Sequence, residues 1–299
     1  MSNILMIGSL GHIGSSLLRR DWNKDDNITI VDNLSTQRYC SLFNLPKKIK
    51  FIEDDFANIS SSELKNYDLI VHLAAITNAE KSFDSQEMVK LVNVDKTQFL
   101  FEKVMSVGKK ILFPSSTSVY GEQSEMVNED SALNPQSPYA ESKIAIEELL
   151  AKSGYKNYII LRLGTIFGIS PGMRFHTAIN KFCYQAAFNR PLTVWKDNID
   201  LYRPYLGLHD LHRAFTLILK NYDVMKTNIY NVITDNYKLS VVLQIILNSI
   251  KTTINYVSSP LLNQLSYKVS IDKIKRFGYE PKDDITAEIK KTLAMLGIP

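Results

Sequence analysis

The stretch Gly8-Ser9-Leu10-Gly11-His12-Ile13-Gly14 decides the fold, and it directly follows the apolar run Ile4–Ile7. The run predicts a strand, and the glycines predict a tight turn into a helix. In such a unit the first glycine permits the turn, the second lets the backbone approach a pyrophosphate, and the third lets helix and strand pack closely. The helix N-terminus then offers free N–H groups to phosphates. A structural turn without a ligand is the alternative interpretation.

Glycine is scarce in the rest of the chain. The 299 residues include 12 glycines, whereas average usage would give roughly 21. Each glycine is therefore expected where a side chain would clash. The hydrophobic fraction of 45% excludes a disordered chain. The length allows one large α/β domain or two modest ones, and the chain has no apolar run long enough for a membrane span.

Charge and cysteine content restrict the partners and the compartment. The 35 basic and 31 acidic residues are spread along the chain and leave a net charge of +4, which requires neither nucleic acid nor a membrane surface. Cys40 and Cys183 form no metal or disulfide pattern. Met1-Ser2-Asn3 passes directly into the first strand, unlike a signal peptide. We expect a soluble cytoplasmic protein without a metal.

Short β-branched runs alternate with helical stretches through residue 165, which predicts a Rossmann-type, doubly wound parallel sheet of the α/β class. Beyond residue 165 the alternation weakens, and a smaller helix-rich C-terminal lobe is expected. We predict a nucleotide-binding domain over 1–165 with 205–235 interleaved into it, and a substrate-binding lobe over 166–204 and 236–299. The expected sheet strands are Asn3–Ile7, Ile28–Val31, Ile49–Ile52, Asp68–Leu73, Lys110–Pro114, Tyr158–Leu163 and Ile229–Val232.

Asp32 strengthens the dinucleotide interpretation. It ends the second expected strand, 18 residues after Gly14. A carboxylate there can accept both hydroxyls of an adenosine ribose and repels a 2′-phosphate, so NAD is favoured over NADP. Asp32 could instead only cap the turn before Asn33.

Tyr139 and Lys143 are four residues apart and therefore share one face of an expected helix. A lysine ammonium beside a phenol favours the phenolate and lowers the phenol pKa. Ser116 follows another expected strand, where a serine can hydrogen-bond a substrate hydroxyl above the sheet. The alternatives are an exposed helix face and a plain turn.

Together these motifs resemble the extended short-chain dehydrogenase/reductase family, whose members include NAD-dependent sugar-nucleotide epimerases such as the UDP-glucose 4-epimerases, and dehydratases. The resemblance covers nearly the whole chain. It implies catalytic roles for Ser116, Tyr139 and Lys143. It implies NAD contacts for Gly8, Gly11, His12, Ile13, Gly14, Asp32, Asn33, Asp55, Phe56, Leu73, Ala74, Ala75, Asn93, Tyr139 and Lys143, and substrate contacts for Thr117, Thr165, Arg174, Asn180 and Arg203.

Departures from the family pattern narrow the reaction. Sugar-nucleotide 4,6-dehydratases place an Asp-Glu pair after the catalytic serine or threonine, and here Thr117 and Ser118 stand there, which disfavours water elimination. Pro260 occupies the place of a C-terminal arginine that grips the diphosphate. That grip would depend on Arg174 and Arg203, or the substrate is an unusual one. Arg174 is alternatively a solvated cation at a helix start. His176 is either a further acid or base or a plain packing residue.

The resemblance implies an epimerase that converts a nucleotide-diphosphate sugar through a 4-keto intermediate. A keto-sugar-nucleotide reductase or dehydrogenase is the alternative within enzymes, and a non-catalytic NAD sensor or scaffold is the alternative outside them. The family commonly dimerises through two helices, which here match 86–106 and 139–152, so a homodimer is expected.

Overall fold

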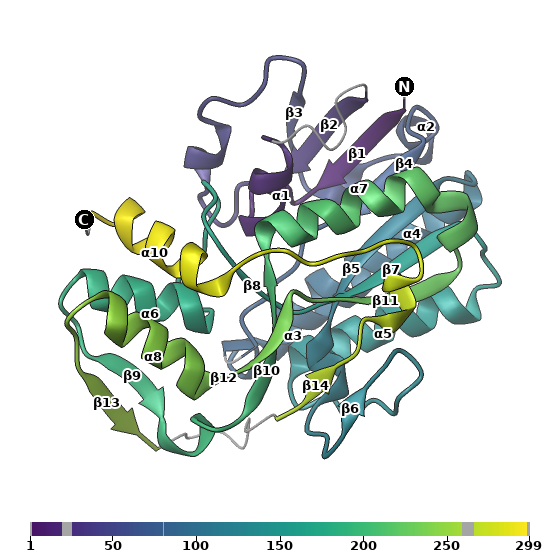
Figure 1. The fold of residues 1–299 in the computed structure, drawn as a ribbon. Coiled ribbons are helices and arrows are strands. Elements are labelled where there is room, and N and C mark those ends of the chain that lie inside the picture. Colours follow the sequence, from purple (N-terminus) through teal and green to yellow (C-terminus); the bar gives the residue numbers. More distant parts are fainter. Residues whose placement is uncertain (1, 20–25, 80, 259–265, 298–299) are drawn as a thin grey trace.

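The computed structural model describes residues 2–19, 26–79, 81–258 and 266–297 (Figure 1). A seven-stranded sheet lies at its centre in the order β11-β7-β5-β4-β1-β2-β3, and every neighbouring pair is parallel. This confirms the Rossmann-type prediction. The strands are β1 (Asn3–Ile7), β2 (Asn27–Asp32), β3 (Lys50–Glu53), β4 (Leu69–His72), β5 (Lys110–Ser116), β7 (Tyr158–Leu163) and β11 (Asn228–Val232).

Helices cover both faces of this sheet (Figure 1). Alternate residues of β1 belong to different cores: Ile4 and Met6 pack with α1 and α7, whereas Leu5 and Ile7 pack with α4 and α5. Because successive side chains of a strand point to opposite faces, a strand buried on both sides must be apolar throughout. The helices are α1 (His12–Leu17), α2 (Ser61–Leu64), α3 (Gln86–Lys90), α4 (Lys96–Ser106), α5 (Pro138–Lys152) and α7 (Leu208–Met225), with a π-helical turn at Leu91–Asp95 between α3 and α4.

The C-terminal part forms a third core, in which α6 (Ala178–Ala187), α8 (Leu239–Ser249) and α10 (Ile285–Met295) pack together. Its short sheets were not expected from the sequence, because strands of two to six residues carry little periodicity. They pair β8 (Thr165–Phe167) and β12 (Asp235–Lys238) with β10 (Tyr202–Gly207), β9 (Leu192–Trp195) with β13 (Ile254–Val257), and β6 (Met126–Val127) with β14 (Lys268–Val269); α9 is Asp272–Lys275.

The strand order reverses between β1 and β4, which opens a crevice at the carboxyl ends of the central strands. The glycine-rich stretch leaves β1 at this point. None of the helices in the described ranges is both long enough and apolar enough for a membrane span.

Candidate active site

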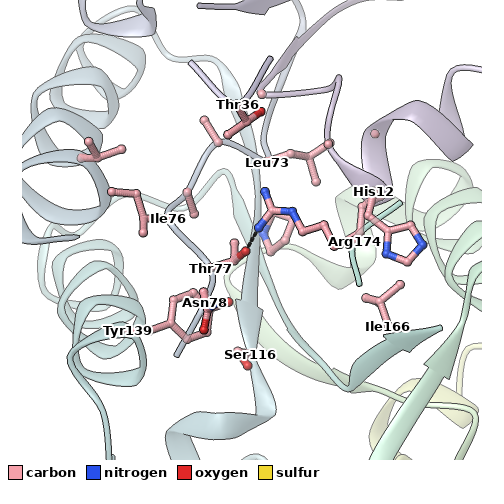
Figure 2. A pocket seen from close by; sticks show the side chains of 18 of the residues that line it. His12, Thr36, Leu73, Ile76, Thr77, Asn78, Ser116, Tyr139, Ile166 and Arg174 are labelled. Atoms are coloured by element: carbon pink, nitrogen blue, oxygen red, sulfur yellow. Dashed lines mark hydrogen bonds between the residues drawn. The ribbon is translucent and has the colours of Figure 1, made fainter. Parts of the chain in front are cut away.

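A cleft of about 770 Å³ lies at the carboxyl ends of the sheet strands. Its walls come from the glycine-rich loop, the ends of β2, β4 and β5, the first turns of α5 and the loop after β8 (Figure 2). Most residues predicted to contact cofactor or substrate line it, and they are Gly8, Gly11, His12, Ile13, Gly14, Asp32, Asn33, Asp55, Phe56, Leu73, Ala74, Ala75, Ser116, Thr117, Tyr139, Lys143, Thr165 and Arg174.

Of the three glycines in the glycine-rich loop, only Gly11 has free space next to its Cα, and this space opens toward the cleft. Gly8 has a φ of +72°, and a Cβ on it would lie 2.4 Å from the Cα of Ala74. A Cβ on Gly14 would lie 2.4 Å from the backbone of Ser9. On Gly11 the nearest heavy atom would be 3.5 Å away. The outer two glycines are therefore required by the protein's own packing, and the middle one faces the cleft, as pyrophosphate binding requires.

The carboxylate of Asp32 is held in place at the end of β2. Its oxygens accept hydrogen bonds from the N–H of Leu34 at 3.0 Å and of Leu10 at 3.3 Å. Asp55, further along the same wall, accepts a hydrogen bond from Lys96 Nζ at 2.5 Å. Burial raises the pKa of Asp55, but this hydrogen bond and one from the N–H of Ala57 outweigh it, so the pKa is lowered.

Ser116, Tyr139 and Lys143 come together where β5 ends beside α5. Ser137 begins the helix by accepting a hydrogen bond from the N–H of Ala140 at 3.2 Å, and Pro138 occupies the first turn. The Tyr139 hydroxyl is then within hydrogen-bonding reach of Ser116. One turn further, Lys143 Nζ donates to the carbonyl of Pro114 at 2.9 Å and lies 5.8 Å from the centre of the Tyr139 ring.

The ionisation of Tyr139 differs from the expectation. Burial raises its pKa to about 12, although the Ser116 hydrogen bond and the positive charge of Arg174 act in the opposite direction. A buried phenolate loses its hydration, and this cost exceeds the effect of the neighbouring groups. Burial also lowers the pKa of Lys143, to about 8, against the charge of Glu147.

Two arginines line the cleft near one another. Arg174, from the loop after β8, donates to the hydroxyl of Thr77 (Figure 2). Burial and the nearby charge of Arg38 lower its pKa to about 10. Arg38 donates to the carbonyl of Met173 at 3.1 Å. Two half-buried guanidinium groups close together, with Asp32 as the carboxylate that acts on both, favour an anionic ligand. Arg38 was not expected in the cleft, and its only signal in the sequence is its place six residues beyond Asp32.

The loop after β8 closes onto the glycine-rich loop. His12 Nε2 donates to the carbonyl of Gly168 at 2.8 Å, and the N–H of Gly172 donates to Ser15 Oγ at 2.9 Å. A Cβ on Gly172 would lie 2.3 Å from the carbonyl oxygen of Leu10, so glycine is required for this approach.

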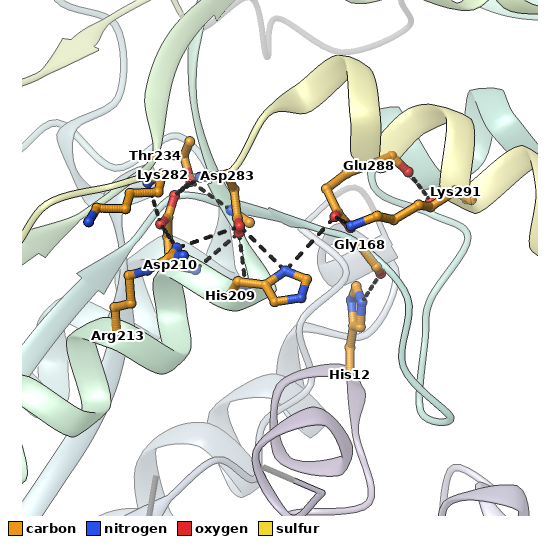
Figure 3. A network of polar contacts seen from close by, with 12 residues as sticks. His12, Gly168, His209, Asp210, Arg213, Thr234, Lys282, Asp283, Glu288 and Lys291 are labelled. Carbon is orange, nitrogen blue, oxygen red and sulfur yellow. Dashed lines mark hydrogen bonds and ion pairs between the residues drawn. The ribbon is translucent and has the colours of Figure 1, made fainter. Parts of the chain in front are cut away.

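A carboxylate network holds the neighbouring helices together (Figure 3). Asp283 accepts hydrogen bonds from the N–H of His209 at 2.9 Å and of Asp210 at 3.0 Å, in the first turn of α7. Asp210 accepts in return from the N–H of Asp283 at 3.0 Å. These bonds fix the chain just before α10 to the start of α7.

We expect His12 to make stability depend on pH. Burial lowers its pKa from 6.5 to about 4. The unfolded chain therefore binds more protons between these values, and the free energy of unfolding falls as the pH drops from 6.5 to 4, by on the order of 3 kcal/mol. His12→Gln keeps a donor for Gly168 and removes the titration. Urea unfolding at pH 7 and pH 4.5 should show a smaller loss for this variant; an equal loss in both proteins would contradict the assignment.

Three predicted residues lie outside the lining of the cleft. Asn93 hydrogen-bonds both the N–H and the carbonyl of Ile76, and thereby holds the chain after β4. Asn180 donates to the carbonyl of Arg174 at 3.0 Å. Arg203 is half-buried in β10 and interacts electrostatically with Tyr205 and Tyr267.

Tyr267 lines the cleft and was not predicted. Its hydroxyl lies 3.3 Å from Thr117 Oγ1. It directly precedes β14, about 150 residues after Thr117 in the chain, and its sequence context contains no signal for this contact. Pro260 lies outside the described residues.

A family model described as the NAD dependent epimerase/dehydratase family matches residues 4–232. A Dictyostelium discoideum dTDP-D-glucose 4,6-dehydratase is 31% identical over 79% of this chain and 59% of that protein. A trifunctional Arabidopsis thaliana protein, a UDP-glucose 4,6-dehydratase with 3,5-epimerase and reductase activities in its name, is 29% identical over 97% of this chain and 46% of its own length. The chain thus spans only about half the length of these two relatives. A Bacillus subtilis protein described as an uncharacterized UDP-glucose epimerase is 30% identical over 72% of both chains.

Solved structures share the fold. A UDP-glucuronic acid 4-epimerase from Bacillus cereus, in complex with UDP-glucuronic acid and NAD, superposes with a TM-score of 0.89 at 23% identity over 99% of both chains. A UDP-glucose 4-epimerase from Thermus thermophilus, in complex with NAD, gives a TM-score of 0.83 at 22% identity over 99% of both chains.

Proposed function

The chain belongs to the NAD-dependent epimerase/dehydratase family, and from this membership we propose that it is an NAD-dependent epimerase of a nucleotide-diphosphate sugar that works through a 4-keto intermediate. One observation carries the proposal: Ser116, Tyr139 and Lys143 meet beside the dinucleotide cleft, while Thr117 and Ser118 supply no carboxylate for water elimination. The similar structures named 4-epimerases support the proposal. Other relatives are named 4,6-dehydratases, and the absence of carboxylates at Thr117 and Ser118 favours epimerisation over water elimination.

NAD fits the residues of the cleft. The open face of Gly11 leaves room for the pyrophosphate beside the N-terminus of α1, and Asp32 is placed to accept the ribose hydroxyls. Lys143 would hold the nicotinamide ribose. When bound, NAD would supply a reversible hydride acceptor for the sugar carbon.

The proton is handled by the chain's own residues. Tyr139 Oη takes the proton of the sugar 4-hydroxyl, and Ser116 Oγ orients that oxygen. The positive charge of Arg174 favours the phenolate, and Lys143 Nζ lies 5.8 Å from the centre of the Tyr139 ring, while burial opposes ionisation. After the ketone has turned over in the cleft, Tyr139 gives the proton back on the other face.

The substrate is held by both parts of the chain in this proposal. Thr117 and Thr165 contact the sugar, and Arg174, supported by Asn180, binds the diphosphate. Arg203 lies outside the lining of the cleft and acts on the diphosphate site through its electrostatic interaction with Tyr267, which lines it. Residues 1–165 with 205–235 form the cofactor domain, and 166–204 with 236–299 form the substrate lobe.

We further propose a cytoplasmic homodimer. Residues 86–106 and 139–152, which correspond to α3, α4 and α5, would form its interface. Phe99 is 53% exposed and Met88 is 51% exposed on these helices, as an interface requires, whereas Val89 is buried in the core. The mass of the purified protein in solution, measured by light scattering, tests this association.

The function is tested with purified protein and a panel of UDP-, GDP-, CDP- and dTDP-sugars. We expect NAD(H) on extraction and an epimerised product by NMR without net consumption of cofactor. Stoichiometric oxidation of added NADH would assign a reductase instead. A protein that binds NAD(H) but turns over none of the sugars would be a sensor, and absence of NAD(H) binding would refute the proposal.

Asp32→Asn is expected to weaken NAD binding by about 10- to 100-fold, because a buried hydrogen bond to a charged group is lost, and to reduce the preference for NAD over NADP. The amide oxygen can still accept from Leu34, so folding should be retained. Glu53→Gln is the matched control, because Glu53 ends β3 directly beside Asp32 without lining the cleft. Fluorescence titration with NADH and NADPH measures both effects; unchanged affinities in Asp32→Asn would remove Asp32 from the site.

A further inference from the structure

Three consecutive residues of β5 are each attached to α5. The carbonyl of Pro114 accepts from Lys143 at 2.9 Å, and Ser116 lies close enough to Tyr139 to oppose the effect of burial on the pKa of its hydroxyl. Between them, Ser115 Oγ donates to Glu147 Oε1 at 2.5 Å. The helix partners are residues 139, 143 and 147, which recur every four positions and share one face of the helix. Two of these three attachments belong to the proposed catalytic residues, and the third has no role in the proposed reaction.

Glu147 is only 4% exposed and is paired with a buried arginine. Arg162 of β7 lies directly across from Ser115 in the sheet and donates to Glu147 Oε2 from Nη2 at 2.7 Å and from Nε at 3.1 Å. Arg162 Nη1 also donates to the hydroxyl of Tyr120 at 2.9 Å. The carboxylate is therefore held in one orientation, with both oxygens hydrogen-bonded.

A buried ion pair is a poor device for stability alone, because apolar side chains of similar volume hold a helix to a sheet equally well. The negative charge of Glu147 also acts on a second neighbour, the ammonium group of Lys143. Lys143 lies one turn before it, also buried, with the ring of Phe113 4.6 Å from Nζ. Among the described residues, the other titratable groups around Lys143 are Tyr139 on the same helix and His72 of β4, whose pKa burial lowers to about 3, so it is neutral. The charge of Arg162 faces the same carboxylate from β7.

We propose that Glu147, held by Arg162 and Ser115, is a positioning residue for the catalytic pair. It is the negative charge that keeps Lys143 cationic beside the cleft, and it fixes the register of α5 on β5 that brings Tyr139 to Ser116. This inference rests on the proposed function, in which Tyr139 and Lys143 carry the proton transfer.

Glu147→Gln tests the role through the titration of Lys143. Without the carboxylate, the ammonium should lose its proton about one pH unit lower, as measured by NMR of protein labelled with ¹³C at lysine Cε and assigned with Lys143→Arg. The alkaline limb of the kcat profile should move by the same amount. Glu148→Gln is the matched control, since Glu148 is the next residue of α5 and pairs with Lys152 at 2.8 Å on the exposed side; both readouts should equal those of the unmodified protein.

A second variant separates positioning from folding. Glu147→Gln leaves Arg162 unpaired, so the double variant Glu147→Gln/Arg162→Met removes both charges, a change that is often close to neutral for stability. It should fold, bind NADH and still show the lowered Lys143 titration. An unchanged titration in a folded variant, or unfolding of both variants, would assign the pair to structure alone and overturn the proposal. Absence of turnover in the unmodified protein would refute the proposed function, while the NMR titration would still decide the role of Glu147.

Discussion

Tyr139→Phe is expected to lower kcat by about 10²- to 10⁴-fold, the usual contribution of a positioned acid–base group. The substitution removes only the hydroxyl that meets Ser116 and leaves the ring in the wall of the cleft. No other tyrosine of the cleft can replace it, because the hydroxyl of Tyr267 lies beside Thr117 instead of Ser116. NADH affinity should stay within a few-fold of the unmodified protein, so the loss should fall on kcat and on the single-turnover reduction of bound cofactor.

Tyr155→Phe is the control for this experiment. Tyr155 lies just beyond the C-terminus of α5, and its hydroxyl donates to the carbonyl of Lys109, away from the cleft. Its removal should leave turnover unchanged. Turnover that survives in Tyr139→Phe at more than a tenth of the original rate would show that another group carries the proton.

Alanine at Gly14 and at Gly11 should have opposite consequences. At Gly14 the new methyl group would lie 2.4 Å from backbone atoms of Ser9, which cannot move without displacing α1 from β1. We expect a loss of stability of about 3 kcal/mol or more from this overpacking. At Gly11 the methyl group meets nothing closer than 3.5 Å, so stability should stay within about 0.5 kcal/mol.

Gly11→Ala should weaken cofactor binding, although it leaves the stability of the fold nearly unchanged. The methyl group would occupy the space of the pyrophosphate, and the dissociation constant for NADH should rise by about 10- to 100-fold, which corresponds to the usual 1–3 kcal/mol of overpacking. Urea unfolding and fluorescence titration of the two variants measure these effects. Normal NADH affinity in a stable Gly11→Ala protein would place the cofactor elsewhere.

The fold was predictable because its signals are local. The alternation of β-branched runs and helical stretches specified every strand of the central sheet, and β1 and β7 have the predicted ends, Asn3–Ile7 and Tyr158–Leu163. The helix α6 begins at Ala178, because Thr177 is extended with ψ of 145°, and Arg174, His176 and Thr177 line the cleft instead. Hydrophobic periodicity cannot detect a segment whose conformation is set by its partners.

The residues of the cleft were predictable where their signal is local and were not predictable where distant segments meet. Asp32, Ser116 and Tyr139 follow from their places at strand ends and in a helix start. Arg38 and Tyr267 contact the cleft because distant elements bring them there, and no spacing in the sequence encodes such contacts. The ionisation of Tyr139 needed the structure as well, since burial, which the sequence does not measure, outweighs the neighbouring charges.

The contact between the loop after β8 and the glycine-rich loop has a consequence for how the protein is made. His12, Ser15 and their partners in 168–172 are separated by 155 to 158 positions in the chain. A ribosome that has released only the first βαβ units has therefore produced the glycine-rich loop without its cover. The sheet itself gains its last strand at 228–232, where the match to the family model also ends. Because Tyr267 also lines the cleft, the nascent chain has a complete cleft only after residue 267 has been synthesised.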